Sequence, residues 1–147
     1  MHRAQMDVQE FHEALEIPVG NYAVPRLSRH ELRAELIREE AKETIQAIED
    51  DDIIGAIDGL CDIIVVTYGA AVEWGVNLGP FWMEVHRSNM AKKGGPTRAD
   101  GKKLKPEGWT PPDIAGVLYT LRMSQHIDGC SFTAGHGWRC APGCPLS

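Results

Sequence analysis

The sequence has few cysteines and no strand-like pattern over most of its length. Its four cysteines all follow residue 60, which is unlike a disulfide scaffold. No apolar core of a signal peptide is present near residue 1, so we expect a cytoplasmic protein. Apolar and polar residues do not alternate over residues 1–93. These absences argue against a secreted or all-β domain and leave helices as the expected elements.

Basic residues are also scarce in the first part of the chain. Residues 1–62 hold 15 of the 21 acidic residues against 6 basic ones, whereas residues 63–147 hold 9 basic against 6 acidic ones. This balance argues against a general DNA-binding surface. Basic residues do not alternate with aromatic ones, as single-stranded nucleic acid would require. The asymmetry fits a protein that binds cations on one side and a phosphorylated small molecule between the two.

One apolar run is long enough to cross a membrane. Residues 53–72 are mostly apolar, which matches the length of a transmembrane helix. Asp58 and Asp62 lie inside this run, and each would cost a few kcal/mol at the centre of a bilayer. We therefore expect a buried helix in a soluble protein, with Cys61 in its core and no membrane partner.

Helical spacing and end signals predict five helices, over about residues 4–16, 28–49, 53–75, 80–92 and 113–123. Val8, Phe11 and Leu15 form the apolar face of the first. Ser28, three residues before Glu31, predicts a capping box, and Asp113 predicts the cap of the last helix. The fold class is therefore all-α, a helical bundle with a long loop after the fourth helix. We expect one domain over residues 1–123 and a Cys- and His-rich tail over residues 124–147.

Carboxylates lie on an unexpected face of the second predicted helix. At 100° per residue, Glu39, Glu40 and Glu43 share the side of the helix that carries Leu32 and Leu36, whereas a solvated acidic face would lie opposite the leucines. The third helix places Asp58 and Asp62 one turn apart. Buried carboxylates must be protonated, paired or metal-bound, and oxygen ligands suit Mg²⁺ or Mn²⁺. The alternative is a solvated charge run.

A basic segment follows these helices. It runs from Glu84 to Lys93 and continues through a loop with Arg98, Lys102, Lys103 and Lys105. Such a segment is a natural partner of a triphosphate. The alternative is a solvated helix end followed by a polar loop.

Four blocks of sequence resemble a known group of enzymes. Glu39-Glu40-x-x-Glu43 is followed on the next helix by Asp58-x-x-x-Asp62, then by residues 84–92 and by Pro111-Pro-Asp-Ile114. Together they resemble the all-α nucleoside triphosphate pyrophosphohydrolases of the MazG and phosphoribosyl-ATP pyrophosphohydrolase superfamily, in particular its bacterial and phage-encoded branch with MazZ-like enzymes. The usual pattern has a glutamate where this chain has Gly59, and Asp58 is the plausible substitute.

The resemblance implies a MazG-like fold, assembled as a homodimer or homotetramer, that hydrolyses a (d)NTP to the monophosphate and pyrophosphate. A phage-encoded enzyme would act in the host cytoplasm. Two or three Mg²⁺ or Mn²⁺ ions per site would hold the triphosphate and activate water. The substrate expected first is dGTP or GTP; alternatives are dUTP, general housecleaning of nucleotides, or a non-catalytic helical assembly protein. The implied metal ligands are Glu39, Glu40, Glu43, Asp58 and Asp62, with Glu39 and Glu43 as catalytic candidates. The implied substrate-binding residues are Asn89, Lys92, Arg98 and Lys102.

Two further predictions concern aromatic residues and the tail. Candidates for stacking on a nucleobase are Tyr22, Tyr68, Trp82 and Trp109, although each is more typical of core packing. The tail offers His126, Cys130, Cys140 and Cys144 as four possible zinc ligands. The alternative is a tail in which these residues are incidental.

Overall fold

The structure is a computed structural model that describes residues 1–124, 131–133 and 137–139. The chain forms two compact units, Met1–Asn77 and Leu78–Ser147, each described here by itself. The first contains α1 (Arg3–Ala14), α2 (His30–Glu49) and α3 (Ile53–Glu73); the second contains α4 (Leu78–Met90), α5 (Ile114–Ser124) and strands β1 (Ser131–Thr133) and β2 (Gly137–Arg139). The all-α prediction is confirmed, with two three-residue strands added. The predicted domain boundary after residue 123 stays a prediction.

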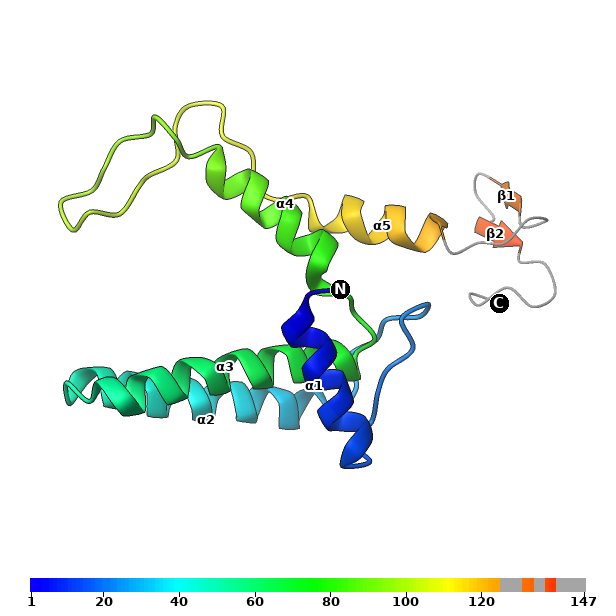
Figure 1. The fold of residues 1–147 in the computed structure, drawn as a ribbon. Coiled ribbons are helices and arrows are strands. Elements are labelled where there is room, and N and C mark those ends of the chain that lie inside the picture. Colours follow the sequence, from blue (N-terminus) through cyan, green and yellow to red (C-terminus); the bar gives the residue numbers. More distant parts are fainter. Residues whose placement is uncertain (125–130, 134–136, 140–147) are drawn as a thin grey trace. The chain divides into compact units, whose positions relative to one another are not determined.

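Helices α2 and α3 form an antiparallel hairpin that runs the length of the first unit (Figure 1). A short acidic turn joins them, in which Asp51 adopts a left-handed backbone (φ 56°). The Asp52 side chain accepts hydrogen bonds from the backbone N–H groups of Ile54 and Gly55, each at 3.1 Å. This N-cap satisfies two donors that would otherwise be unpaired at the start of α3.

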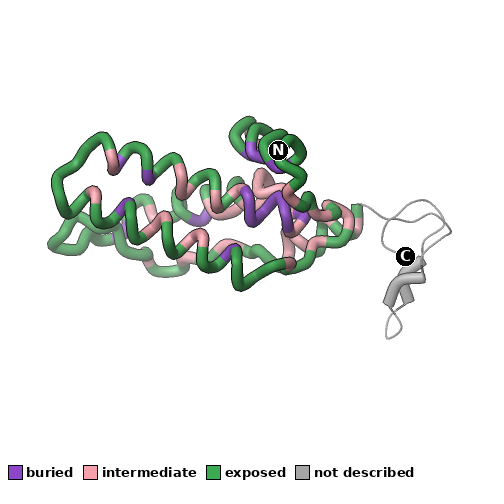
Figure 2. The backbone as a smooth tube through the Cα atoms, turned by 90° about the horizontal axis from the view of Figure 1, so that it is seen from below, coloured by how far each residue is buried: buried purple, intermediate pink, exposed green. Residues whose placement is uncertain are grey.

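The core of the first unit lies where α1 passes the C-terminal half of α3 (Figure 2). Helix α1 buries Gln5, Val8 and His12; of the predicted apolar face, Val8 is buried but Phe11 and Leu15 are exposed. Gln5 Nε2 donates to the carbonyl oxygen of Val76 at 2.6 Å. Polar side chains with hydrogen-bond partners thus take up part of the buried face, which apolar spacing alone does not predict.

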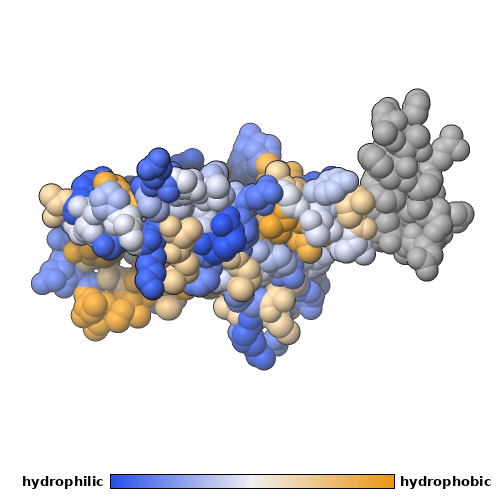
Figure 3. All heavy atoms as spheres, turned by 90° about the horizontal axis from the view of Figure 1, so that it is seen from above, coloured by the Kyte–Doolittle hydropathy of each residue, from blue (hydrophilic) through white to orange (hydrophobic). Residues whose placement is uncertain are grey.

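Helix α3 is buried mainly at its C-terminal end, with Ala56 and Gly59 also buried nearer its start, which corrects the prediction of a helix buried along its length. Val72 is fully buried, whereas Ile54 is 79% exposed and Cys61, expected in the core, is exposed as well. By length and composition α3 could cross a membrane, but a single such helix is weak evidence, and 22% of its most apolar window is buried within the chain. In Figure 3 apolar residues reach the surface in groups rather than singly.

The predicted capping box at the start of α2 is wrong. The Ser28 hydroxyl donates to the carbonyl oxygen of Glu73 at 3.1 Å, and the Ser28 carbonyl accepts from Trp74 Nε1 at 2.8 Å. Arg29 is the N-cap residue instead, with a left-handed backbone (φ 41°) and no side-chain cap. Ser28 therefore binds the loop before α2 to the end of α3 and does not cap α2.

In the second unit, Asp113 caps α5 as predicted. Its Oδ1 accepts the backbone N–H of Gly116 at 2.8 Å. Residues 91–113 connect α4 to α5 and include one short hairpin, in which Thr97 pairs with Lys103. Gly101 lies at its tip with φ 87°, a conformation that favours glycine. β1 and β2 are antiparallel, with Phe132 opposite Trp138.

Candidate functional site

The carboxylates singled out from the sequence lie on the facing helices α2 and α3. Glu40 on α2 and Asp62 on α3 are half-buried, and Glu39, Glu43 and Asp58 are exposed. The inward orientation predicted for the acidic residues therefore holds for two of the five within this chain. Other parts of the chain do not cover the whole of α2, because Ile45 and Ile48 are 54% and 58% exposed.

Electrostatics shows that the five carboxylates form one cluster, which we call the acid cluster. Burial raises the pKa of Glu40 above its ordinary value, and the negative charges around it raise it further. The contributing carboxylates, from strongest to weakest, are Asp62, Glu43, Glu39 and Asp58. Asp62 acts across the helix pair more strongly than the neighbours of Glu40 on its own helix. Among the four carboxylates, Asp62 therefore has the largest effect on Glu40 and Asp58 the smallest.

The acid cluster has little positive charge to balance it. Arg38, one of two basic residues on that part of α2, forms an ion pair with Glu35 instead. Lys42 shares an open surface hollow with Glu39 and Glu43. Several negatively charged carboxylates that lie close enough to raise the pKa of Glu40 are suitable ligands for a hard divalent cation. In the described part of the chain, however, no three His, Cys, Asp or Glu side chains already converge on a common metal position.

In the usual pattern of the enzymes that this sequence resembles, a glutamate takes the place of Gly59. The packing around this position explains why a residue without a side chain is found here. A Cβ atom on Gly59 would overlap Oγ1 of Thr44 on α2 and would lie 3.1 Å from the Thr44 Cα. Both residues are buried. A glutamate at position 59 would thus require the two helices to separate. Asp58 is the nearest carboxylate but also the weakest contributor to the field at Glu40.

A buried ion-pair network lies at the other end of the hairpin and was missed from the sequence. Glu73, 3% exposed, accepts hydrogen bonds from Arg29 Nε at 2.6 Å and Arg33 Nε at 2.6 Å. Burial opposes ionisation of Glu73, but the two arginines outweigh it and lower the pKa of its carboxyl. Arg29, at the N-cap of α2, and Arg33, in its first turn, are four residues apart in the sequence, and this spacing was the available signal. The network joins α2 to α3 but is not part of the acid cluster.

The predicted substrate-binding residues all lie in the second unit, where the side chains of Asn89, Lys92 and Arg98 already have partners. Lys92 donates to Asn89 Oδ1 at 2.8 Å, and its ammonium lies 5.8 Å from the centre of the Trp109 ring. Arg98 donates from Nε to Asp100 Oδ1 at 2.9 Å, and the Lys102 backbone N–H donates to the same carboxylate. A phosphate would therefore have to compete with Asp100 for Arg98.

The stacking candidates differ in their contacts. Trp109 lies under the ammonium of Lys105 at 4.2 Å and donates from Nε1 to the Ser88 carbonyl at 2.8 Å. The Tyr22 hydroxyl donates to Gln9 Oε1 at 2.9 Å. These contacts are typical of packing, as the sequence also allowed.

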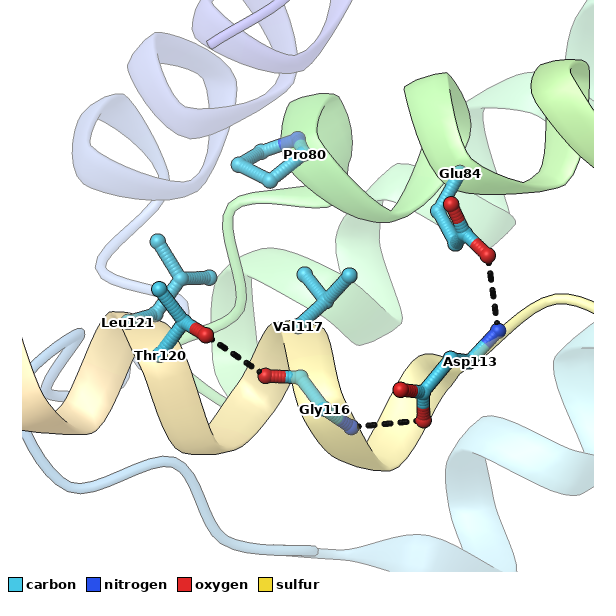
Figure 4. Close-up of a pocket in the computed structure, with 7 residues that line it drawn as sticks. All are labelled: Pro80, Glu84, Asp113, Gly116, Val117, Thr120 and Leu121. Carbon is cyan, nitrogen blue, oxygen red and sulfur yellow. Dashed lines mark hydrogen bonds between the residues drawn. The ribbon is translucent and has the colours of Figure 1, made fainter.

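Figure 4 shows a pocket between α4 and α5 of about 490 Å³. Glu84 lies at one end, where its Oε1 accepts the backbone N–H of Asp113 at 2.8 Å. Hydrogen bonds from Arg87, and then the bond from the Asp113 N–H, lower the pKa of Glu84 to about 2. The remaining lining is mainly apolar and comes from Pro80, Gly116, Val117, Thr120 and Leu121. Glu84 thus stays ionised and joins the helices structurally.

The possible zinc ligands of the tail, His126, Cys130, Cys140 and Cys144, lie outside the described residues.

Carboxylates on two consecutive antiparallel helices of a mainly helical chain are the arrangement that the resemblance to the all-α nucleotide pyrophosphohydrolases implies. The family model for phosphoribosyl-ATP pyrophosphohydrolase matches residues 8–89. The chain belongs to this family, whose members are hydrolases that act on acid anhydrides. The match includes the whole acid cluster and ends at Asn89, before Lys92, Arg98 and Lys102. No curated protein matches the sequence.

Proposed function

We propose that this protein hydrolyses a (deoxy)nucleoside triphosphate, with dGTP first and GTP next, to the monophosphate and pyrophosphate in the presence of Mg²⁺ or Mn²⁺. The choice of a purine follows from the resemblance to the phage-encoded, MazZ-like branch. The observation that supports the reaction is the raised pKa of Glu40, caused by burial and by four neighbouring carboxylates. Such a cluster without a matching positive charge is stabilised by divalent cations.

The proposed roles follow from the positions of the carboxylates. Glu40, Glu43 and Asp62 would hold the metal ions, and Glu39 and Asp58 would complete the ligand set. Glu39 or Glu43 would orient the attacking water and accept its proton. When bound, the metal would neutralise the triphosphate charge and lower the pKa of that water. Asn89, Lys92, Arg98 and Lys102 would contact phosphate or sugar.

Pyrophosphate release tests this function directly. The full chain is incubated with Mg²⁺ or Mn²⁺ and each dNTP, dUTP, GTP and phosphoribosyl-ATP in turn. We expect fastest turnover of dGTP, and turnover abolished by EDTA. A preference for dUTP or phosphoribosyl-ATP would keep the reaction and overturn the substrate. No pyrophosphate from any of them, with the protein folded, would favour the non-catalytic helical assembly protein.

We also propose that the protein assembles as a homodimer or homotetramer. The support is the exposed apolar surface along α2 and α3, since a contiguous apolar patch of this kind usually marks an interface. Its described residues are Ile45, Ile48, Ile53, Ile54, Ile57, Leu60, Ile64 and Val65, which are between 39% and 79% exposed. A second copy of the hairpin would remove them from water.

A charge placed in this surface is expected to weaken assembly. Ile57→Lys should raise the dissociation constant of the oligomer at least about tenfold, because the buried ammonium would lose its hydration. Sedimentation equilibrium measures the change. Leu27→Lys is the matched control, since Leu27 is 69% exposed but lies in the loop before α2. A wild-type chain that sediments as a monomer at all concentrations would contradict the proposal.

A further inference from the structure

We infer that Thr44 and Gly59 are positioning residues for the acid cluster: their contact sets the separation of α2 and α3 beside the turns that carry Glu40 and Asp62. This inference rests on the proposed function, because the acid cluster is taken as the metal site. Thr44 follows Glu43 and Gly59 follows Asp58 in the chain, so the two residues lie within the cluster's own turns.

The packing between Thr44 and Gly59 leaves no space for a side chain at position 59. Thr44 is 3% exposed. An added Cβ on Gly59 would overlap Thr44 Oγ1 and would lie 3.1 Å from both Cα and Cβ of Thr44. Two of these three atoms belong to or adjoin the α2 backbone. Rotation of the Thr44 side chain would therefore relieve the overlap only in part, and the helices would have to move apart.

The Thr44 hydroxyl has a second contact that ties it to the cluster. Oγ1 donates to the carbonyl oxygen of Glu40 at 2.7 Å. This bond fixes the side-chain rotamer of Thr44, which presents the hydroxyl between the Glu40 turn and Gly59. Thr44 thus contacts both the helix that bears Glu40 and the helix that bears Asp62.

The position of this contact ties it to two members of the acid cluster. Glu40 lies four residues before Thr44 and Asp62 lies three residues after Gly59, so in the antiparallel hairpin (Figure 1) both lie on the same side of the contact. A glutamate at position 59 would supply another oxygen ligand but would separate the helices. We expect this chain to depend on the short separation of the helices instead of that carboxylate.

The test measures Mn²⁺ binding to the full chain without nucleotide, by electron paramagnetic resonance of the free ion, and thermal unfolding of the same samples. Gly59→Ala is expected to weaken Mn²⁺ binding at least tenfold. The matched control is Gly69→Ala, ten residues further along α3, where an added Cβ would lie 3.0 Å from Arg33 Nη1 and 3.1 Å from His12 Nε2. That variant should lose stability but bind Mn²⁺ within twofold of wild type.

A compensating variant separates positioning from general damage. Thr44→Ala combined with Gly59→Ala removes the overlap with Oγ1, so it should bind Mn²⁺ more tightly than Gly59→Ala alone. This variant also serves if Gly59→Ala does not fold. Equal Mn²⁺ affinity in wild type and in Gly59→Ala, or no gain in affinity when Thr44→Ala is added to Gly59→Ala, would overturn the inference and leave the metal site standing. A wild-type chain that binds no Mn²⁺ would overturn the metal site and the inference together.

Discussion

Glu40→Gln is expected to lower the rate of pyrophosphate release by about 10³-fold or more. The substitution keeps the size of the side chain but removes the charge at the centre of the acid cluster, where four other carboxylates act on it. Metal ions stabilise transition-state charge by several kcal/mol, and about 4 kcal/mol corresponds to this factor. Initial rates at saturating substrate and Mg²⁺ measure the loss, with circular dichroism to verify the helices.

The control for this prediction is Glu35→Gln on the same helix. Glu35 is exposed and paired with Arg38, outside the acid cluster. Its substitution should leave the rate within about twofold, because Glu35 is not among the carboxylates that act on Glu40. A Glu40→Gln enzyme as active as Glu35→Gln would show that the acid cluster is not the catalytic centre.

The second large effect concerns stability. Glu73→Gln is expected to lower the free energy of unfolding by about 3–5 kcal/mol, because it leaves Arg33 buried without its carboxylate. The Arg33 side chain is 6% exposed and that of Glu73 is 1% exposed. Urea unfolding at neutral pH measures the difference. Glu35→Gln, which breaks an exposed pair, should cost about 1 kcal/mol or less.

The pH dependence gives this second prediction a further test. The pKa of Glu73 in the folded protein lies below its ordinary value of 4.5. Its stabilising contribution is therefore complete above that value and is lost as the pH falls through the lowered pKa. The difference between wild type and Glu73→Gln should be constant near neutral pH and should shrink in acid below 4.5. A difference that stays the same across that range would contradict an ionic contribution.

The helices could be predicted from the sequence because apolar spacing, Pro80 and the Asp113 cap are local signals. The start of α2 was predicted wrongly because Ser28 is used over a long range, by the end of α3, which local patterns do not reveal. Exposure along α3 was missed for a related reason. A run of apolar residues predicts burial but does not say whether the same chain or another copy provides the cover.

The acid cluster was predictable because four-residue spacing places Asp58 and Asp62 on one face, and the structure brings them into the field of Glu40. The contact between Thr44 and Gly59 could not be predicted from the sequence, because it depends on which turns of α2 and α3 pack against each other. Arg98 was named for its charge alone, and its pairing with Asp100 comes from a loop conformation that spacing does not encode.

The unbalanced charge of the acid cluster also has a kinetic consequence under the proposed function. A free triphosphate that diffuses toward this surface meets charge of its own sign, so its association is slowed rather than steered. Added monovalent salt would screen that repulsion, because exposed charges more than about 10 Å apart interact weakly at 0.1 M ionic strength. The bimolecular rate constant for an uncomplexed nucleotide would then rise with salt, whereas the metal complex of the nucleotide, with much of its charge neutralised, would arrive at a rate that depends little on it.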